Sequence, residues 1–286
     1  MTTIHLFAGQ GSQRVGMGRQ LLAAYPNLVR QADEVLGYSV AELCLDGPAE
    51  RLADTRFTQP AVYVVDALSY VDTVRITGVI PDLVAGHSLG EYAALFAAGA
   101  YDFRTGLEIV ARRAALMADA GPGAMAAVIG LDEMRVRDLL RDAGHDVDVA
   151  NLNAPDQIVV SGPVEAVASV TPLLSAHADT VVRLPVSGAF HSRQMASAAR
   201  EFDRFLRGYV FARLKIPVIA NTTARPYDGD TASTLVRQLT QPVRWSETVG
   251  HCLDQPDPQL HEIGPGTVLT GLTRRIRAAR SAAVAL

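Results

Sequence analysis

Apolar positions along the chain recur with two different spacings. Short continuous apolar runs are separated by longer stretches in which apolar side chains return every three or four positions. The runs predict buried strands and the longer stretches predict helices, because these spacings place apolar side chains on one face of the respective element. The first part of the chain thus predicts strands over 3–8 and 82–85 and helices near 17–35, 59–77, 89–98 and 104–118. Alternating strands and helices favour an α/β fold with a parallel sheet covered on both faces.

A Gly-Pro break at 120–123 is followed by a different order of elements. The pattern there is strand, helix, strand, strand, helix, strand, with expected bounds of 124–129, 132–143, 147–151, 157–161, 164–177 and 180–185. This order is typical of the split βαββαβ, ferredoxin-like arrangement. We therefore expect a small ferredoxin-like domain over residues 123–191, inserted into a larger α/β domain.

The chain from residue 192 onward is expected to return to the larger domain. A helix over 193–209 precedes apolar runs at 217–220 and 259–263, which can complete the first sheet. The larger domain is then discontinuous and consists of residues 1–122 and 192–286. A cleft between two such domains is the expected place for a substrate.

Composition narrows the possible functions. Of 286 residues, 49% are hydrophobic and 20% charged, and the formal net charge is -4, so the chain can bury a large core but lacks the excess of cations that nucleic-acid binding needs. Cys44 and Cys252 lie far apart without partners at metal-ligand spacing, so we expect no disulfide framework and no metal site. We also expect no cofactor. No apolar run is long enough to span a bilayer, and no export signal precedes the first strand. We therefore expect a cytoplasmic protein without membrane contact. We also expect a monomer.

The pentapeptide Gly86-His87-Ser88-Leu89-Gly90 lies where an apolar strand gives way to an apolar helical stretch. A strand, a sharp turn and a helix form the nucleophile elbow of serine enzymes, in which small residues let the backbone close tightly and hold the serine hydroxyl out into a cleft. Ser88 is thus the first candidate nucleophile. The alternative is a tight turn with an idle serine.

A glycine-rich segment, Gly9 to Gln13, follows the first strand. Its spacing does not fit a nucleotide-binding loop, because Arg14 takes the place of the third glycine of a dinucleotide fingerprint and no Gly-Lys-Ser/Thr follows. In a serine enzyme such a turn can direct a backbone N–H toward a developing oxyanion. The Gln10 amide is well placed for this, with the Leu89 amide as the second donor. The alternative is that the glycines only form a loop.

His191 is the best candidate among the seven histidines for a general base. It lies in an irregular segment, Val186 to Ser192, where the small domain returns to the larger one, so it is expected to face the cleft that also exposes Ser88. His87 adjoins Ser88 but points along a different direction from the elbow, which makes it a poor base for its neighbour. A neutral His191 that accepts the serine proton would permit acyl transfer through a covalent ester near neutral pH.

Six signatures, taken together and in order, resemble those of the malonyl-CoA:acyl carrier protein transacylases. They are Gly9-Gln10-Gly11-Ser12-Gln13, Gly86-His87-Ser88-Leu89-Gly90-Glu91, Asn153-Ala154-Pro155-x-Gln157, Gly188-Ala189-Phe190-His191-Ser192, Gln238-Leu239-x-x-Pro242-Val243-x-Trp245 and Glu262-Ile263-Gly264-Pro265-Gly266. The resemblance implies an α/β-hydrolase-like large domain with a parallel sheet and a ferredoxin-like small one. It also implies an [acyl-carrier-protein] S-malonyltransferase, which moves malonyl from malonyl-CoA to the phosphopantetheine thiol of an acyl carrier protein by a ping-pong mechanism.

The resemblance further implies roles for single residues. The expected roles are nucleophile for Ser88, base for His191, and oxyanion hole for the amides of Gln10 and Leu89. Gln238 would orient His191 through its backbone carbonyl, in place of the carboxylate of a hydrolase triad. His87 and Asn153 are possible further residues of the pocket.

Arg113 is the expected site for the carboxylate of the malonyl group. A buried carboxylate needs a fixed cation, and the planar guanidinium with its two-pronged set of donors fits that need better than a lysine. Arg112 and Arg113 lie about 100° apart on one helix, so only one can face the cleft. The family pattern of arginine followed four residues later by methionine selects Arg113 with Met117, although Ala114 stands where the family commonly has glycine. The alternative is a solvated pair of arginines.

Phe190, directly before the base, resembles the bulky residue of malonyl-preferring members, whose ring would crowd a 2-methyl branch. One methyl group is worth only about 1 to 3 kcal/mol of discrimination, so a transferase with a preference for a 2-substituted malonyl unit stays an alternative.

A serine hydrolase that removes acyl groups from carrier proteins is another alternative function, although such a hydrolase has no use for a cation such as Arg113. A non-catalytic docking partner is disfavoured by the retained site residues. Because the chain ends soon after the last signature, we expect a free-standing acyltransferase of fatty-acid or trans-acyltransferase polyketide synthesis.

Overall fold

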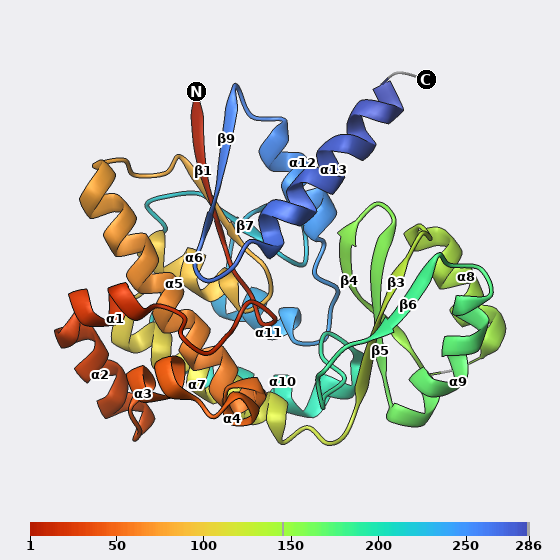
Figure 1. Ribbon diagram of the computed structural model, residues 1–286, viewed down its shortest axis with the longest axis horizontal. Coiled ribbons are helices and arrows are strands. Elements are labelled where there is room, and N and C mark those ends of the chain that lie inside the picture. The colour runs from red at the N-terminus through yellow and green to blue at the C-terminus, as the bar shows by residue number, and fades with distance from the viewer. Residues whose placement is uncertain (145, 285–286) are drawn as a thin grey trace.

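The computed structural model describes residues 1–144 and 146–284, which contain two separate sheets (Figure 1). The larger sheet has five strands in the order β8-β7-β2-β1-β9. Their bounds are β1 (Thr2–Phe7), β2 (Leu83–Gly86), β7 (Val218–Ala220), β8 (Arg225–Pro226) and β9 (Pro258–Ile263). The expected α/β fold is confirmed. The sheet is mixed rather than purely parallel, because the two-residue strand β8 turns back antiparallel on β7, while the other neighbours are parallel.

Helices cover both faces of this sheet, because neighbouring side chains of its strands point to opposite sides. Ile4 and Leu6 pack in one core with Trp245 and Leu272, which lie on α12 (Trp245–Leu253) and α13 (Val268–Val284). Phe7 packs in the larger core on the opposite side. That core is built by the helices α5 (Thr55–Thr77), α6 (Gly90–Ala97), α7 (Phe103–Ala118), α10 (Ala196–Leu206) and α11 (Thr231–Gln238).

The helical region before α5 differs from the expected single helix over 17–35. Four short helices occur there, α1 (Arg19–Ala24), α2 (Pro26–Leu36), α3 (Val40–Asp46) and α4 (Ala49–Ala53). Pro26 disfavours helical dihedrals at the preceding residue, and Tyr25 accordingly has φ -122° and ψ 56°, which ends α1 and starts α2. The helix expected over 193–209 is also shorter, since a single 3₁₀ turn at Arg193–Met195 precedes α10.

The smaller sheet is antiparallel, with strand order β4-β5-β3-β6. Its elements occur in the predicted order along the chain: β3 (Ala124–Ile129), α8 (Glu133–Ala143), β4 (Asp148–Ala154), β5 (Gln157–Gly162), α9 (Val164–Ser175) and β6 (Thr180–Arg183). Helices α8 and α9 cover its outer face (Figure 1). Strand β4 is the strand of the smaller sheet that contacts the larger part of the molecule. There the Leu152 amide donates to the Val243 carbonyl at 2.9 Å.

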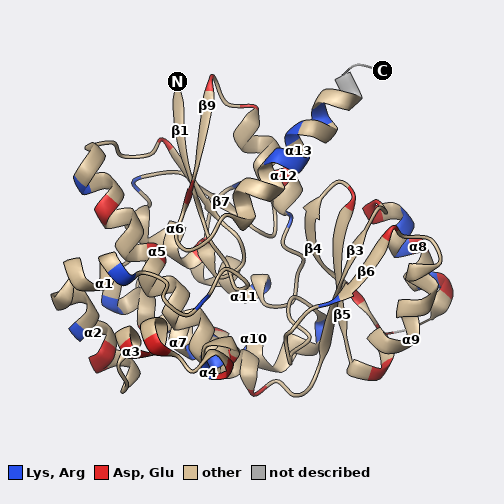
Figure 2. Ribbon diagram, in the orientation of Figure 1, with Lys and Arg blue, Asp and Glu red and all other residues tan. Residues whose placement is uncertain are grey.

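Charged residues of both signs are mixed along the outer helices of both parts (Figure 2). None of the helices in the described part of the chain is both long enough and apolar enough to cross a membrane.

Candidate active site

Ser88 lies in a sharp turn between β2 and α6 and has the left-handed φ of 51°. The glycines on either side are needed for close backbone contacts: a Cβ at Gly86 would lie 1.9 Å from the carbonyl carbon of Gly90, and a Cβ at Gly90 would lie 2.2 Å from the carbonyl oxygen of Phe7. Asn221, at the end of β7, holds the turn from outside, because its Oδ1 accepts from the Ser88 amide at 2.7 Å and its Nδ2 donates to the Gly86 carbonyl at 2.7 Å. The turn therefore presents the serine in a fixed, strained geometry.

His191 is in hydrogen-bond contact with Ser88, with 2.7 Å between Nε2 and the serine Oγ. Its other ring nitrogen, Nδ1, lies 2.8 Å from the backbone carbonyl oxygen of Gln238. Since a carbonyl only accepts, Nδ1 carries the proton and Nε2 is left free to accept one from the serine. Burial, with the positive charge of Arg113 as the second cause, lowers the pKa of His191 to about 3, so the ring is neutral around pH 7.

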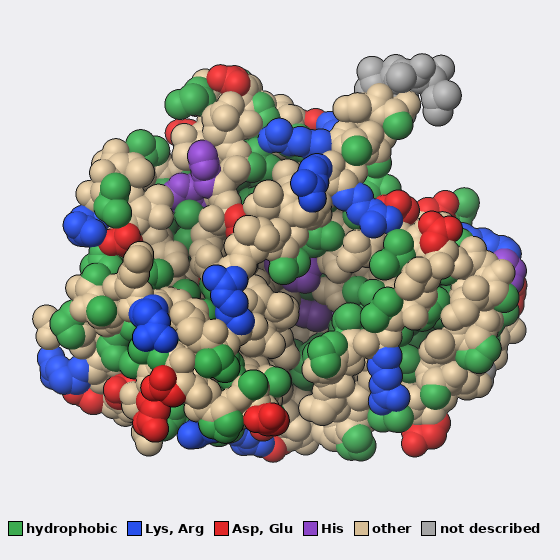
Figure 3. Space-filling model, viewed as in Figure 1, with side chains coloured by type: hydrophobic (Ala, Val, Ile, Leu, Met, Phe, Trp, Pro, Cys, Tyr) green, Lys and Arg blue, Asp and Glu red, His purple; other side chains and the backbone are tan. Residues whose placement is uncertain are grey.

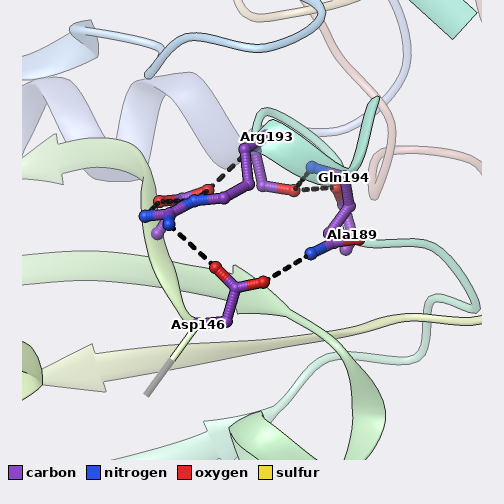
Figure 4. A network of polar contacts seen from close by, with 6 residues as sticks. Asp146, Ala189, Arg193 and Gln194 are labelled. Carbon is purple, nitrogen blue, oxygen red and sulfur yellow. Dashed lines mark hydrogen bonds and ion pairs between the residues drawn. The ribbon is translucent and has the colours of Figure 1, made fainter. Parts of the chain in front are cut away.

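Arg193 and Gln194, which follow His191 in the chain, are bonded to Asp148 at the start of β4 and to Asp146 just before it (Figure 4). The Arg193 backbone amide donates to Asp148 Oδ2 at 2.8 Å, and the Arg193 guanidinium pairs with both Asp148 and Asp146. Gln194 adds a bond from its Nε2 to Asp146 Oδ2 at 2.9 Å. His191 itself has a left-handed φ of 55°, so this conformation depends on such contacts around it.

Arg113, on α7, is 1% exposed and reaches the same serine. Its Nη2 donates to Ser88 Oγ at 3.1 Å and to Gln238 Oε1 at 2.9 Å, while Nη1 donates to Gln59 Oε1 at 2.6 Å. The guanidinium carbon lies 5.1 Å from the ring centre of Tyr92, which supports the cation from one side. The guanidinium thus rests on neutral groups and makes no direct contact with a carboxylate among the described residues.

Gln238 contacts more of the site than its backbone carbonyl alone. Its side-chain Nε2 donates to the Ser88 carbonyl at 2.9 Å and to the buried carboxylate of Glu91. Tyr227 also donates to Glu91, at 2.5 Å, and burial raises the pKa of this carboxyl to about 7. These contacts, and those made by Gln59 and Asn221, could not be predicted from the sequence, because all depend on segments far apart in the chain.

The two proposed oxyanion donors lie at the same edge of the larger sheet. Gln10 follows β1 and Leu89 follows β2, and these parallel neighbours end side by side. A Cβ at Gly9 would lie 2.4 Å from the His87 carbonyl oxygen, so only glycine lets the first loop come this close to the serine turn. Within residues 1–144 and 146–284, neither amide has a protein acceptor, which leaves both N–H groups free for a ligand.

His87 connects the serine turn to the small sheet. Its Nε2 lies 2.8 Å from Asn153 Oδ1, and its ring meets the edge of Trp245 at 5.2 Å between centres. Burial lowers the pKa of His87. As expected, His87 does not serve Ser88 as a hydrogen-bond partner in the structure.

A cavity of about 280 Å³ opens over these groups and is lined from both parts of the molecule. Histidine side chains are visible at the bottom of the corresponding hollow in Figure 3. The lining includes most of the predicted site residues: Gln10, His87, Ser88, Arg113, Met117, Asn153, Phe190 and His191. The side chains of Leu89 and Gln238 are fully buried behind it. The arrangement combines an activated hydroxyl, a neutral base, free amides and a buried cation in one pocket, which suits acyl transfer of an anionic group.

Comparison with known proteins agrees with this chemistry. The acyl transferase domain family matches residues 4–284. The polyketide biosynthesis malonyl CoA-acyl carrier protein transacylase BaeC of Bacillus velezensis is 48% identical over 277 residues, which cover 96% of each chain. The crystal structure of the malonyl CoA-acyl carrier protein transacylase from Burkholderia pseudomallei has a TM-score of 0.93 at 44% identity, over 97% of this chain and 98% of that one. A second structure, PlMCAT:AntF, holds a type II PKS acyl-carrier protein in complex with its malonyl-transacylase; it has a TM-score of 0.92 at 38% identity, over 96% of this chain and 93% of that one.

The element order, the serine turn, the cavity and these likenesses over nearly the full length agree. The chain belongs to the acyl transferase domain family and, within it, to the malonyl CoA-acyl carrier protein transacylases.

Proposed function

We propose that this protein is an acyltransferase that moves a malonyl group from malonyl-CoA to the phosphopantetheine thiol of an acyl carrier protein. The observation that carries the proposal is the position of the Ser88 hydroxyl, 2.7 Å from His191 Nε2 and 3.1 Å from Arg113 Nη2. A neutral base activates the hydroxyl, and a buried cation next to it selects an acyl group that ends in an acid. The names of the relatives support both the donor and the acceptor.

In the first half-reaction, Ser88 Oγ attacks the thioester carbonyl while its proton moves to His191 Nε2. The negative charge on the carbonyl oxygen is stabilised by the amides of Gln10 and Leu89. The carbon–sulfur bond then breaks, the proton passes from His191 to the departing thiolate of coenzyme A, and a malonyl ester of Ser88 is left. The Gln238 carbonyl supports the imidazolium of this step by accepting from Nδ1–H.

The second half-reaction repeats these steps with the carrier protein as acceptor. His191 takes the proton of the phosphopantetheine thiol, and the sulfur attacks the malonyl ester. The ester bond to Ser88 breaks, and the serine regains its proton from His191. The protein returns to its starting state, so each turnover uses one malonyl-CoA and yields one malonyl carrier protein.

Arg113 and Phe190 would determine which acyl groups the enzyme accepts. In this proposal the malonyl carboxylate binds the guanidinium of Arg113, which is held by neutral amides and is therefore free to pair with a substrate anion. Met117 adjoins it in the cavity wall. Phe190 lines the same cavity and would crowd a branch at carbon 2, so malonyl is preferred over methylmalonyl by about 1 to 3 kcal/mol.

The finer description of the fold belongs to the same proposal. We take residues 1–122 and 192–286 as an α/β-hydrolase-like large domain and residues 123–191 as a ferredoxin-like small domain. The parallel core of the first sheet and the β4-β5-β3-β6 order of the second support this division. The relatives support service in polyketide or fatty-acid synthesis. The cytoplasmic location, the monomeric state and the absence of a cofactor stay predictions.

A hydrolase that removes acyl groups from carrier proteins is the second candidate, since it would use the same serine and base. Arg113 disfavours it, because a fully buried cation beside the nucleophile hinders plain acyl chains.

Intact-mass measurement tests the proposal directly. Incubation with malonyl-CoA is expected to add one malonyl mass to the wild-type protein and none to Ser88→Ala. Ser161→Ala, which alters a buried serine of β5, is the control and keeps the label. Added holo carrier protein should then remove the label much faster than water does. A labelled Ser88→Ala variant would contradict the assignment, and equal rates of loss to water and to carrier protein would favour the hydrolase.

A further inference from the structure

Strand β4 of the small sheet contacts both halves of the site, one at each end. Near its C-terminal end, Asn153 bonds to His87, the neighbour of Ser88, at 2.8 Å. At its N-terminal end, Asp148 bonds to Arg193, two residues beyond His191. The same strand thus spans from the turn that carries the hydroxyl to the segment that carries the base.

The strand is itself held firmly to the larger part of the molecule. Between its two ends, the amide of Leu152 donates to the Val243 carbonyl at 2.9 Å and the amide of Val243 donates to the Ala150 carbonyl at 2.9 Å. Since an extended strand has little freedom along its axis, the distance between its two ends is nearly fixed. β4 therefore acts as a spacer between the two segments it contacts.

Asp148 contacts both the backbone amide and the side chain of Arg193, although both residues lie near the surface. Its carboxylate accepts from the Arg193 backbone amide at 2.8 Å and from Nε at 3.0 Å, and it also pairs with Nη2 at 2.5 Å. The Asp148 side chain is 22% exposed, whereas the Arg193 side chain is 62% exposed and also reaches Asp146. An isolated exposed ion pair contributes little, but this one includes a backbone donor and several bonds in one geometry.

The segment between Ala189 and Gln194 needs such an external hold. Its internal bonds are few: Ser192 Oγ donates to the Ala189 carbonyl at 2.6 Å and accepts from the Gln194 amide at 3.2 Å. His191 between them has a left-handed backbone, which costs free energy in a residue with a side chain and relaxes if the surroundings allow it. Release of Arg193 would let the backbone of His191 relax and move its ring away from Ser88.

We infer that Asp148 is a positioning residue of the reaction: through Arg193 it fixes the backbone of His191, and with it the separation of the base from the Ser88 hydroxyl. The inference rests on the proposed function, because it assumes that this separation limits the formation of the acyl-enzyme. It concerns the base alone, so it applies equally to every acyl group that the site accepts.

The test is the single-turnover rate of acylation, measured by rapid quench and intact mass and expressed per labelled Ser88. In Asp148→Ala, the rate with malonyl-CoA and with acetyl-CoA is expected to fall by the same factor, roughly ten- to a hundred-fold, as expected for a small displacement of a catalytic group. KM for malonyl-CoA should stay within about two-fold, because Asp148 does not line the cavity. Asp148→Asn still accepts from the Arg193 amide and is expected to recover part of the rate.

Two further variants separate positioning from general stability. Arg193→Ala removes the side-chain bonds of this contact but keeps the one from its backbone amide to Asp148, so it should lower the rate by a smaller factor than Asp148→Ala does. The double variant should be no slower than Asp148→Ala, because that substitution already removes the whole contact. Asp203→Ala removes a more exposed carboxylate of α10, which pairs with Arg207 just after that helix and does not line the cavity, and it should keep the wild-type rate.

Several results would overturn the inference. A rate per labelled Ser88 that is unchanged in Asp148→Ala, additive losses in the double variant, or a loss confined to malonyl-CoA would each do so. If Asp148→Ala does not fold, Asp148→Asn and Arg193→Ala give the same decision. A wild-type protein that takes up no label from malonyl-CoA would instead contradict the proposed function, so the two failures are distinguishable.

Discussion

The Nη2 of Arg113 lies 3.1 Å from the hydroxyl oxygen of Ser88, so the buried cation and the candidate nucleophile touch before a substrate arrives. An acyl group bound to this serine has its first carbons within reach of the guanidinium. A three-carbon group that ends in a carboxylate can form both the ester and the ion pair, whereas an acetyl group can form only the ester. The contact itself therefore links nucleophile and selectivity.

Substitution of Arg113 tests this link. Arg113→Ala is expected to lower kcat/KM for malonyl transfer by about a hundred-fold or more, because the substrate carboxylate loses a buried partner worth about 3 kcal/mol. Acetyl transfer should change by less than about ten-fold. Steady-state rates with both thioesters check the prediction, and Arg112→Ala, which removes the exposed neighbouring cation, serves as control. Equal losses with both substrates would remove the proposed role of Arg113.

Phe190 is expected to determine how well the enzyme accepts acyl groups with a branch at carbon 2. The ring is 5% exposed and lines the cavity, so Phe190→Leu makes room beside the acyl group. The ratio of methylmalonyl to malonyl transfer should rise by about ten-fold, the effect expected for one methyl group. Competition between the two thioesters, read by mass, gives the ratio. Phe202→Leu changes a buried ring outside the cavity and should leave it unaltered. A ratio that stays at its wild-type value in Phe190→Leu would mean that another residue limits the size of the branch that the site accepts.

Asn221 holds the serine turn from the neighbouring strand and is expected to matter for the rate. Asn221→Ala leaves the Ser88 amide and the Gly86 carbonyl without their partners, each in a buried or half-buried place. The unfolding free energy should fall by about 2 kcal/mol, and the acylation rate should fall as the strained turn relaxes. Urea unfolding and rapid-quench acylation measure the two effects. An unchanged rate in a destabilised variant would restrict Asn221 to a structural role.

Glu91 gives a pH dependence of stability with a defined sign. Burial raises the pKa of this carboxyl from 4.5 to about 7, so the folded state holds a proton that the unfolded state releases at lower pH. The resulting stabilisation is complete below pH 4.5 and is lost as the pH rises through 7, a change of about 3 kcal/mol. Between pH 4.5 and 7.5 the unfolding free energy of Glu91→Gln, relative to wild type, should rise by that amount. Urea unfolding at several pH values checks this; a constant difference would show that folding leaves the pKa of Glu91 unchanged.

The sequence was most informative where structure is local. The strand, turn and helix around Ser88 follow from a few adjacent residues, and the glycines at 86 and 90 are needed for contacts with their own neighbours or with β1. The order of elements in the small sheet could also be predicted, since each has a clear apolar spacing. The helix expected over 17–35 was wrong because Pro26 interrupts an otherwise continuous helical pattern, and the short helices α3 and α4 have too few turns to show a period.

The site could be predicted only in part, because several of its contacts join distant segments. His191 was selected because it lies where the predicted small domain ends, and it does lie next to Ser88, although 103 positions separate them. Gln238 could be suggested only through the family resemblance, and its side-chain contacts were missed. Gln59 and Asn221 were missed entirely, since an amide in a helix or at a strand end has no spacing that distinguishes it.

The contacts of Gln238 have a practical consequence for anyone who wishes to retarget the enzyme. This one residue meets the base through its carbonyl, and the cation, the serine backbone and Glu91 through its side chain. Substrate range and reactivity are therefore coupled at this position, so most variants in a library randomised at Gln238 would be inactive. Phe190 and Met117 make up part of the cavity wall without sharing those partners, so they are the better starting points for the design of enzymes that load unusual building blocks.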